Sequence, residues 1–526
     1  MKKVLATVSM LGLLSLTAVG CTDGSPTTGD EQDLTSVRGQ SRELRFEGRV
    51  YVTPGSSDSQ ILDVVHRQTK TAFGPLRTIG IGVNNRELKG VDPATFIKRE
   101  VTVIDTDKAG DTGKKMLEVR YTYVDDAVVP TELESRSSVP LALLRPDYTA
   151  EKDRILKECT ANDQEARDFA DALWYVFEPS RSACQKAIQA EQKKVDAARA
   201  KLKDSATQVA KLESNRLYLP ITAALGADKT NEGKSYPEYD RLYKGGVQPG
   251  KLVISLINGL IDHGEGGSLA EDPGYGEWLD TLDQVMSEYP AFTLVGAESG
   301  EDLTHFTLAS GKAVTLSFPE AISLHAGTRP AGLTYAEGTE LEGLFAERVA
   351  DQWVTFALPR KVKIGKTGKT KAFTVELTTF FGHAETTTPF KHAIKNSDVF
   401  LYNGHSLIGF GPLDPRNFTA SDFPTSYQIL FIDSCVSYNY YEADYIPLKS
   451  GGTKNLDLIT NAVESPSYQS GYALGQFVNT LINGKQASYL DLLQAAEATG
   501  DGMRVVDGEL DNTYDPAKKP IKVTAP

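Results

Sequence analysis

Residues 398–437 read DVFLYNGHSLIGFGPLDPRNFTASDFPTSYQILFIDSCVS and contain two short apolar runs, 399–402 and 429–432. Each run has the length of a buried strand, and turn-forming residues bound it. Near-continuous apolar strands are typical of a parallel sheet that is covered on both faces. His405 follows the first run and Cys435 follows the second. Because reacting groups in such sheets lie just past the carboxyl ends of the strands, the sequence predicts that both residues face one crevice, as a cysteine nucleophile and its base require.

Two motifs carry a resemblance to a known family. Residues 402–406, YNGHS, resemble the Y-S-G-H-G histidine motif of metacaspases, and residues 433–437, DSCVS, resemble their D-S-C-H-S-G cysteine motif. The order of the motifs, the strand before each and the separation of 30 residues between His405 and Cys435 fit the wider group of caspases, metacaspases, gingipains and legumains. The resemblance implies a caspase-like α/β domain with a mostly parallel sheet over residues 246–505.

The same resemblance implies roles for individual residues. His405 and Cys435 would form the catalytic dyad of a cysteine peptidase, and the backbone N–H groups of Ser406 and Cys435 would hold the oxyanion. Family members usually carry glycine where Ser406 stands. Loops after the cysteine strand shape the substrate pocket in the family, so Glu442 and Asp444 are expected in the cleft wall. His383, which follows another strand end, and Asp433, in the cysteine motif, are further possible wall residues. Acidic residues there imply a preference for a basic substrate side chain, although a solvated loop is an equally open interpretation.

The first 41 residues are predicted to be a targeting segment and a tether. Residues 1–20 have a basic start and an apolar stretch too short to span a membrane, as in a signal peptide. The segment ends in small residues followed by Cys21, which resembles a bacterial lipobox and implies lipid attachment at that cysteine. Residues 21–41 are rich in Gly, Ser, Thr and Asp and predict a flexible tether. The expected location is therefore a cell-envelope membrane, held through a lipid anchor, unless the signal is an ordinary cleaved one.

Three further segments complete the predicted organisation. Alternating runs predict an antiparallel β domain of sandwich type over residues 42–140, and helical spacing predicts a hairpin or coiled-coil segment over residues 147–215. Residues 506–526 are predicted to be a C-terminal tail. An exported chain can oxidise Cys159 and Cys184 to a disulfide. Because a single helix between them would hold the two residues too far apart, that bridge requires a bend in the helix.

Composition and spacing exclude other classes of function. The net charge of −14 argues against a nucleic-acid partner, whose binding needs phosphate neutralisation. A lipase-type elbow with Ser406 as nucleophile fails because no histidine follows His405 in the chain. His383 and His392, together with His405, have no accepted zinc-ligand spacing with Cys435. We expect no catalytic metal and no other cofactor, although the resemblance to metacaspases leaves calcium activation open.

Two functional hypotheses follow from these patterns. The first is a cysteine endopeptidase that acts on protein substrates at the cell envelope through His405 and Cys435. The second is a catalytically inactive caspase-like lipoprotein that serves in binding or surface assembly. The retained dyad favours the first, whereas Ser406 and the valine at position 436, in place of the family's histidine, favour the second. The oligomeric state is not indicated by the sequence.

Overall fold

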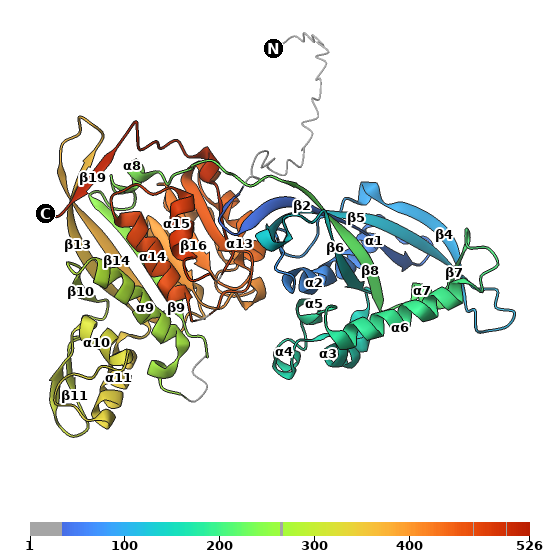
Figure 1. Cartoon of the computed structure of the whole chain (residues 1–526), viewed down its shortest axis with the longest axis horizontal. Helices are drawn as coiled ribbons and strands as arrows, with labels where there is room; N and C mark the ends of the chain where they lie inside the picture. Colours follow the sequence, from blue (N-terminus) through green and yellow to red (C-terminus); the bar gives the residue numbers. More distant parts are fainter. Residues whose placement is uncertain (1–33, 263–266, 467, 501) are drawn as a thin grey trace, which may run out of the picture.

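The computed structural model describes residues 34–262, 267–466, 468–500 and 502–526, so the predicted signal segment and Cys21 lie outside the described residues. The chain forms a multidomain α/β structure with two large sheets (Figure 1). The N-terminal region, residues 37–228, contains a seven-stranded sheet. The C-terminal region, residues 239–526, contains a ten-stranded sheet, to which residues 35–36 also contribute a strand.

The C-terminal sheet is parallel in its centre and antiparallel at its edges. Strands β14, β9, β15, β16 and β17 are parallel neighbours, whereas β18, β13, β10, β19 and β1 all pair in the antiparallel sense. The prediction of a mostly parallel sheet is therefore correct only for the central strands. In spatial order the strands are β1 (Thr35–Ser36), β18 (Arg504–Asp507), β17 (Leu456–Asn461), β16 (Gln428–Asp433), β15 (Val399–Asn403), β9 (Lys251–Gly259), β14 (Lys371–Gly382), β13 (Gln352–Ile364) and β10 (Thr293–Ala297), with β19 (Ile521–Thr524) beside β13.

Helices cover both faces of the central strands. Leu401 of β15 and Phe431 of β16 pack with helices α9 (Pro273–Glu288), α14 (Ser470–Ile482) and α15 (Tyr489–Ala496), which lie in front of the sheet in Figure 1. Their neighbours Phe400 and Ile432 point to the opposite face, toward helices α12 (Thr387–Asn396) and α13 (Ser437–Tyr445). Coverage on both sides explains why these strands are apolar at nearly every position. The remaining helices of this region are α8 (Tyr239–Leu242), α10 (Phe318–His325) and α11 (Tyr335–Val349), beside a hairpin of β11 (His305–Thr307) and β12 (Ala313–Thr315).

The N-terminal sheet extends beyond the predicted β domain. Its order is β6 (Ser138–Leu144), β8 (Tyr218–Asp228), β2 (Gly39–Val52), β5 (Lys114–Pro130), β4 (Ile97–Ile104) and β7 (Gln208–Ala210), with β3 (Gly82–Val83) beside β5. Helices α1 (Asp58–Thr69) and α2 (Phe73–Arg77) pack on it. A single sheet covered by helices replaces the predicted sandwich, because the apolar stretch after residue 58 has helical rather than alternating spacing.

The predicted helical hairpin over residues 147–215 is also different in the structure. This segment contains α3 (Lys152–Cys159), α4 (Asp163–Asp168), α5 (Leu173–Val176), α6 (Ser182–Arg199) and α7 (Lys211–Ser214). Strand β7 lies between α6 and α7 and joins the N-terminal sheet in parallel with β4. A single helix between Cys159 and Cys184 does not form, because the segment is broken between α4 and α5. Through this bend Cys159 and Cys184 come together and form a disulfide, with their Cα atoms 4.8 Å apart.

Both predicted terminal extensions contribute strands. The predicted tether ran to residue 41, but Thr35–Ser36 pairs with β18 and Gly39 already begins β2. The predicted tail over residues 506–526 contains β19, which pairs with β13. Unpaired backbone groups at a sheet edge favour such additions. Among the described residues, no helix combines the length and apolar character that crossing a membrane requires.

Candidate active site

The candidate site lies where the chain leaves the centre of the C-terminal sheet. After β9 the chain forms β10, β13 and β14, which lie on one side of β9. It then crosses to the other side and forms β15, β16 and β17, so the strand order reverses at β9. Crevices at such a reversal, past the carboxyl ends of the strands, are the usual ligand sites of open α/β sheets. Ile261 follows β9, His405 follows β15 and Cys435 follows β16. The structure thus places the predicted dyad at the edge that the topology favours.

His405 and Cys435 line the same cavity, whose volume is about 560 Å³. Ser406 lies in its wall as well. The opposite wall comes from the N-terminal region, mainly from the bend between α4 and α5. The lining residues from that region are Lys70, Arg167, Asp168, Phe169, Ala170, Asp171, Ala172, Trp174 and Tyr175. The predicted crevice is therefore a cavity between the two regions of the chain.

Backbone and tyrosine contacts fix the orientation of His405. Its ring nitrogen Nε2 lies 2.7 Å from the carbonyl oxygen of Ile261. Because a carbonyl oxygen only accepts hydrogen bonds, this contact requires a hydrogen on Nε2, so in the neutral imidazole the basic lone pair is on Nδ1. The hydroxyl of Tyr402 donates to the carbonyl of His405 at 2.9 Å and holds the loop. Gly404 has φ +156°, and a Cβ there would meet the Tyr402 hydroxyl at 2.5 Å, so glycine is required before the histidine.

The loops after both strands contain unusual backbone conformations. Val436, directly after Cys435, has φ 52°, and Leu407 and Ile408, which follow Ser406, have φ 49° and 47°. Left-handed conformations are uncommon for residues other than glycine, and for β-branched residues they are real outliers. Each costs about 1–3 kcal/mol and persists only where the surrounding structure enforces it. Three such residues next to the candidate dyad indicate that the surrounding packing enforces the backbone conformation of both loops.

The Cys435 thiol is held in its neutral form. Burial raises the pKa of Cys435 above its usual value, and the nearby carboxylates of Glu464 and Asp433 raise it further. The sulfur lies 3.7 Å from the carbonyl oxygen of Ser465, to which the thiol can donate. A preformed thiolate, the usual nucleophile, is therefore disfavoured in this state. A nucleophilic role for Cys435 would require deprotonation of the thiol.

The Ser406 backbone is held by its neighbours. The hydroxyl of Tyr441 donates to the Ser406 carbonyl at 3.0 Å. In a trans peptide the carbonyl and the following N–H point in opposite directions. Because the His405 carbonyl points toward Tyr402, the Ser406 N–H points away from that tyrosine. This orientation is compatible with the predicted oxyanion role, and the Ser406 side chain itself is buried.

Asp433 is engaged inside the protein. Its carboxylate forms an ion pair with Arg504 at 2.7 Å, and both side chains are almost completely buried. The Ser465 hydroxyl donates to the other carboxylate oxygen at 3.2 Å. Asp433 is not among the residues that line the Cys435 cavity. Asp433, which was predicted as a possible cleft-wall residue, instead pairs with Arg504 inside the protein.

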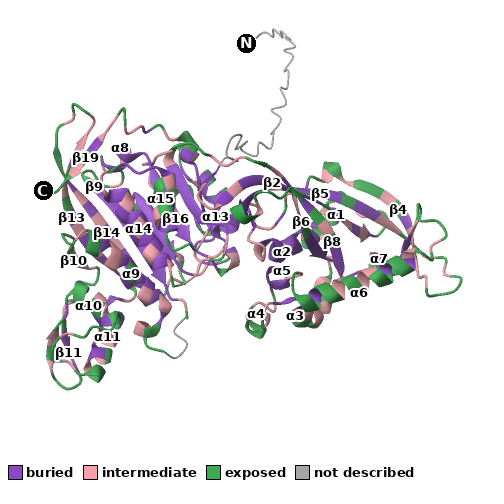
Figure 2. Cartoon of the chain, in the orientation of Figure 1, coloured by how far each residue is buried: buried purple, intermediate pink, exposed green. Residues whose placement is uncertain are grey.

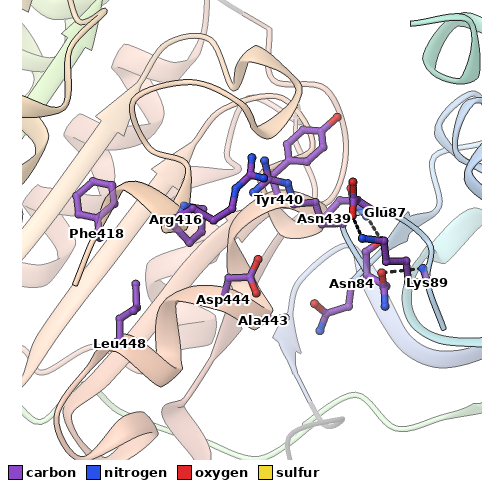
Figure 3. A pocket seen from close by; sticks show the side chains of 13 residues that line it. Asn84, Glu87, Lys89, Arg416, Phe418, Asn439, Tyr440, Ala443, Asp444 and Leu448 are labelled. Atoms are coloured by element: carbon purple, nitrogen blue, oxygen red, sulfur yellow. Dashed lines mark hydrogen bonds and ion pairs between the residues drawn. The ribbon is translucent and has the colours of Figure 1, made fainter. Parts of the chain in front are cut away.

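The other three predicted wall residues lie elsewhere. Glu442 is buried against Thr460, at 3.3 Å, and burial raises the pKa of its carboxyl well above the usual range. Asp444 lies on α13 but faces a second cavity of about 490 Å³, beside Arg416 and Asn439 (Figure 3). His383 is exposed, and its Nδ1 lies 2.9 Å from the Asp351 carboxylate. None of the three lines the cavity that contains Cys435.

The second cavity also lies between the two regions. Figure 3 shows Asn84, Glu87 and Lys89 of the N-terminal region across from side chains of the C-terminal region. Arg86 and Arg416 both bind the carboxylate of Asp414, which these two guanidinium groups neutralise. In the part of the chain that the structure describes, no cluster of three or more His, Cys, Asp or Glu side chains could hold a metal ion.

Comparison with known proteins gives no family for this chain. No protein-family model, no curated protein and no solved structure matches it.

Several residues of the site were not predicted from the sequence. The Ile261 carbonyl contributes a backbone atom, for which side-chain identity carries no signal. The aromatic wall from Phe169 to Tyr175 comes from a segment predicted to be one continuous helix. Arg504 lies 71 residues after Asp433, and no local pattern connects them.

Proposed function

We propose that this chain is a cysteine endopeptidase of caspase-like type, with Cys435 as nucleophile and His405 as acid and base. One observation carries the proposal: His405 and Cys435, from neighbouring parallel strands, line one cavity, and the histidine is oriented by a backbone carbonyl. A nucleophile, a base and a third group that orients the base are the parts that covalent catalysis requires. The topology and the two motifs support the same interpretation.

The proposed reaction starts from the neutral thiol. His405 removes the Cys435 proton through Nδ1 while the sulfur attacks the carbonyl carbon of the scissile peptide bond. The tetrahedral oxyanion is held by the N–H groups of Ser406 and Cys435. His405 then gives the proton to the leaving amine, the C–N bond breaks and a thioester remains on Cys435. Water, deprotonated by His405, hydrolyses the thioester and restores the thiol.

A second function, a binding module without catalysis, is supported by the state of the thiol. Burial and the nearby carboxylates of Glu464 and Asp433 raise the pKa of Cys435 and so favour its neutral form. A cysteine kept for packing has this character. The two functions differ in whether removal of His405 changes the reactivity of Cys435 and whether any peptide bond is cleaved.

We also propose that the chain is an exported lipoprotein, anchored through Cys21 to a cell-envelope membrane. The basic, apolar and small-residue order of residues 1–21 supports export. The disulfide between Cys159 and Cys184 supports an oxidising compartment, because such bonds are rare where thiols are kept reduced. The proposed substrates are accordingly proteins or peptides at the envelope.

The test compares the wild-type chain with Cys435→Ala, His405→Ala and the control His305→Ala, an exposed histidine of the β11–β12 hairpin. Cleavage of unfolded casein is followed by mass spectrometry, and iodoacetamide labelling of Cys435 is followed across pH by peptide mapping. We expect loss of cleavage in Cys435→Ala, and a loss of about 10²–10⁴-fold in His405→Ala, the usual contribution of a general acid and base. The control retains wild-type cleavage. Cleavage that survives in Cys435→Ala contradicts the proposal, and labelling indifferent to His405 without any cleavage favours the binding module.

A further inference from the structure

The cavity beside Cys435 has walls that are mostly aromatic and aliphatic. From the N-terminal region, Phe169, Trp174 and Tyr175 face it. From the loop after His405, Leu407, Ile408 and Phe410 face it. Apolar walls of this kind, with a few polar groups at one end, are typical of pockets that bind an organic side chain. The polar residues that line it include His405, Ser406 and Cys435.

The aromatic wall is held rigidly. The ring of Tyr175 stacks between Phe73, at a centroid distance of 5.5 Å, and Phe169, at 4.8 Å. Its hydroxyl donates to Glu464 of the C-terminal region at 3.0 Å. The amine of Lys70 lies 4.4 Å from the centroid of the Trp174 ring. A preorganised aromatic surface loses little conformational entropy when it receives a ligand.

The facing loop leaves large apolar side chains in solvent. Leu407 is 44% exposed and Phe410 is 53% exposed. The two residues lie three positions apart, and both line the cavity. Arg86 lies 4.9 Å from the centroid of the Phe410 ring and holds its position. A single exposed apolar residue needs no explanation, but neighbouring ones at the edge of a cavity mark a binding surface.

The charges around the cavity do not match a basic ligand. Among the described residues that line it, the carboxylates are those of Asp168 and Asp171, and both side chains are exposed at its rim. Asp171 pairs with Lys152 at 2.8 Å, and Asp168 accepts hydrogen bonds from Gln164. Asp433 is paired with Arg504. A lysine or arginine side chain would lose its hydration here without gaining a buried partner.

We propose that this cavity binds a large aromatic or aliphatic side chain of a peptide substrate, next to the scissile bond, and that both regions of the chain form this subsite. The proposal deepens the proposed peptidase function and rests on it for the reaction. It departs from the preference for basic side chains that the sequence resemblance implies. One extra or missing methylene group in an apolar pocket changes kcat/KM by about 10–200-fold, so a side chain that fills the pocket should be clearly preferred to glycine.

The first measurement separates binding from catalysis. The Cys435→Ala chain is titrated with Ac-Ala-Phe-Ala-NH2, Ac-Ala-Leu-Ala-NH2, Ac-Ala-Arg-Ala-NH2 and Ac-Ala-Gly-Ala-NH2 by isothermal calorimetry. We expect the Phe and Leu peptides to bind at least about tenfold more tightly than the Arg and Gly peptides. Phe410→Ala in the same background reduces the preference, and Tyr335→Ala, an equally large exposed aromatic residue on α11, leaves it unchanged. Arg binding as tight as Phe binding, or no binding of any peptide, overturns the proposal.

The second measurement uses the wild-type chain and quenched peptides with Phe, Leu, Arg, Asp or Gly at each position flanking one bond. We expect cleavage that requires Cys435 and is fastest with Phe or Leu beside the bond. Cleavage that requires Cys435 but is fastest with Arg overturns the subsite and leaves the peptidase intact. Selective binding of the Phe peptide without cleavage of any peptide leaves the subsite intact and contradicts the peptidase.

Discussion

The C-terminal and N-terminal sheets bury their strands in different ways (Figure 2). Every residue of β15, β16 and β17 is buried, because helices and the N-terminal region cover both faces. In the N-terminal sheet, β2 mostly alternates between buried residues and residues that are half-buried or exposed. The first pattern is typical of a central parallel strand and the second of a sheet with one covered face.

The difference assigns separate tasks to the two regions. The central C-terminal strands end at the candidate nucleophile and base, and their packing fixes both positions. The N-terminal region contributes one wall of the cavity from the bend between α4 and α5, and that wall is held by the disulfide and by contacts between the regions. We therefore expect changes in the C-terminal strands to be severe for the whole fold, and changes in the wall to be milder and more local.

The largest expected effect comes from Asp433→Asn. This change leaves the buried Arg504 guanidinium without the carboxylate that it binds at 2.7 Å. Removal of one partner from a buried ion pair typically costs about 3–5 kcal/mol. We expect the free energy of unfolding of the C-terminal region to fall by that amount in urea titrations. Asp302→Asn, which affects an exposed pair with His305, is the control and changes stability little. If the two variants lower the free energy of unfolding equally, the expectation that changes in the central strands destabilise the fold most is wrong.

The next effect concerns the wall. The disulfide between Cys159 and Cys184 closes a loop with a sequence separation of 25. This loop contains the bend that carries Phe169 and Trp174. Replacement of both cysteines by serine should lower the free energy of unfolding by about 3 kcal/mol, since the open loop gains entropy in the unfolded chain. Limited proteolysis should then cut within residues 163–176 first. If proteolysis instead cuts the C-terminal region first, loss of the disulfide destabilises that region too, and its effect is not local to the wall.

The same difference between the regions explains what the sequence could predict. The apolar runs at 399–402 and 429–432 are buried on both faces, so their composition alone indicated strands, and β15 and β16 are where the prediction put them. The segment after residue 58 lies inside the predicted β domain but forms helix α1, whose buried residues Ile61 and Val65 are four positions apart, as in a helix. The alternating runs elsewhere in that domain did not indicate this helix.

Only the part of the candidate site that consists of side chains just past the strand ends could be predicted from the sequence. Cys435 and His405 were found because each directly follows an apolar strand. Glu442 and Asp444 were misplaced because α13 turns the first into the core and the second toward another cavity. The wall from Phe169 to Tyr175 depends on the bend and the disulfide, which the sequence left open as a possibility without indicating that this segment faces Cys435.

A pH experiment compares one buried carboxyl from each region. Burial raises the pKa of Asp125 on β5 and of Asp457 on β17 to about 7 in both cases. Each carboxyl is protonated in the folded state between pH 4 and 7 but ionised in the unfolded state, so the folded chain binds more protons there. Stability therefore falls as pH rises from about 4 to about 7 and is level above that range. Asp125→Asn and Asp457→Asn should each remove part of this fall, on the order of 2 kcal/mol.

Thermal unfolding between pH 4 and 8 measures the effect, and Asp58→Asn, at an exposed position, is the control. If the N-terminal region unfolds separately, Asp125→Asn changes only its transition and Asp457→Asn only that of the C-terminal region. A single transition that both variants shift alike would show that the continuous hydrophobic contact between the regions makes them cooperate.

The smallest expected effect comes from Glu464, which connects the wall to the candidate nucleophile. Its half-exposed side chain pairs with Arg77 and accepts a hydrogen bond from the Tyr175 hydroxyl. Exposed pairs contribute about 1 kcal/mol or less, so Glu464→Ala should lower the free energy of unfolding only slightly. The Glu464 charge also raises the pKa of Cys435. Its removal should therefore increase the iodoacetamide labelling rate of Cys435 at pH 8.

Glu464→Gln distinguishes the two reasons for faster labelling. Glutamine removes the charge but keeps an acceptor for the Tyr175 hydroxyl. If Glu464→Gln and Glu464→Ala accelerate labelling equally, the carboxylate acts on the thiol through its charge and the wall stays closed. If only Glu464→Ala does so, loss of the Tyr175 contact opens the wall and gives the reagent access. Unchanged rates in both variants would mean that Glu464 only joins the two regions, and that burial alone keeps the thiol neutral.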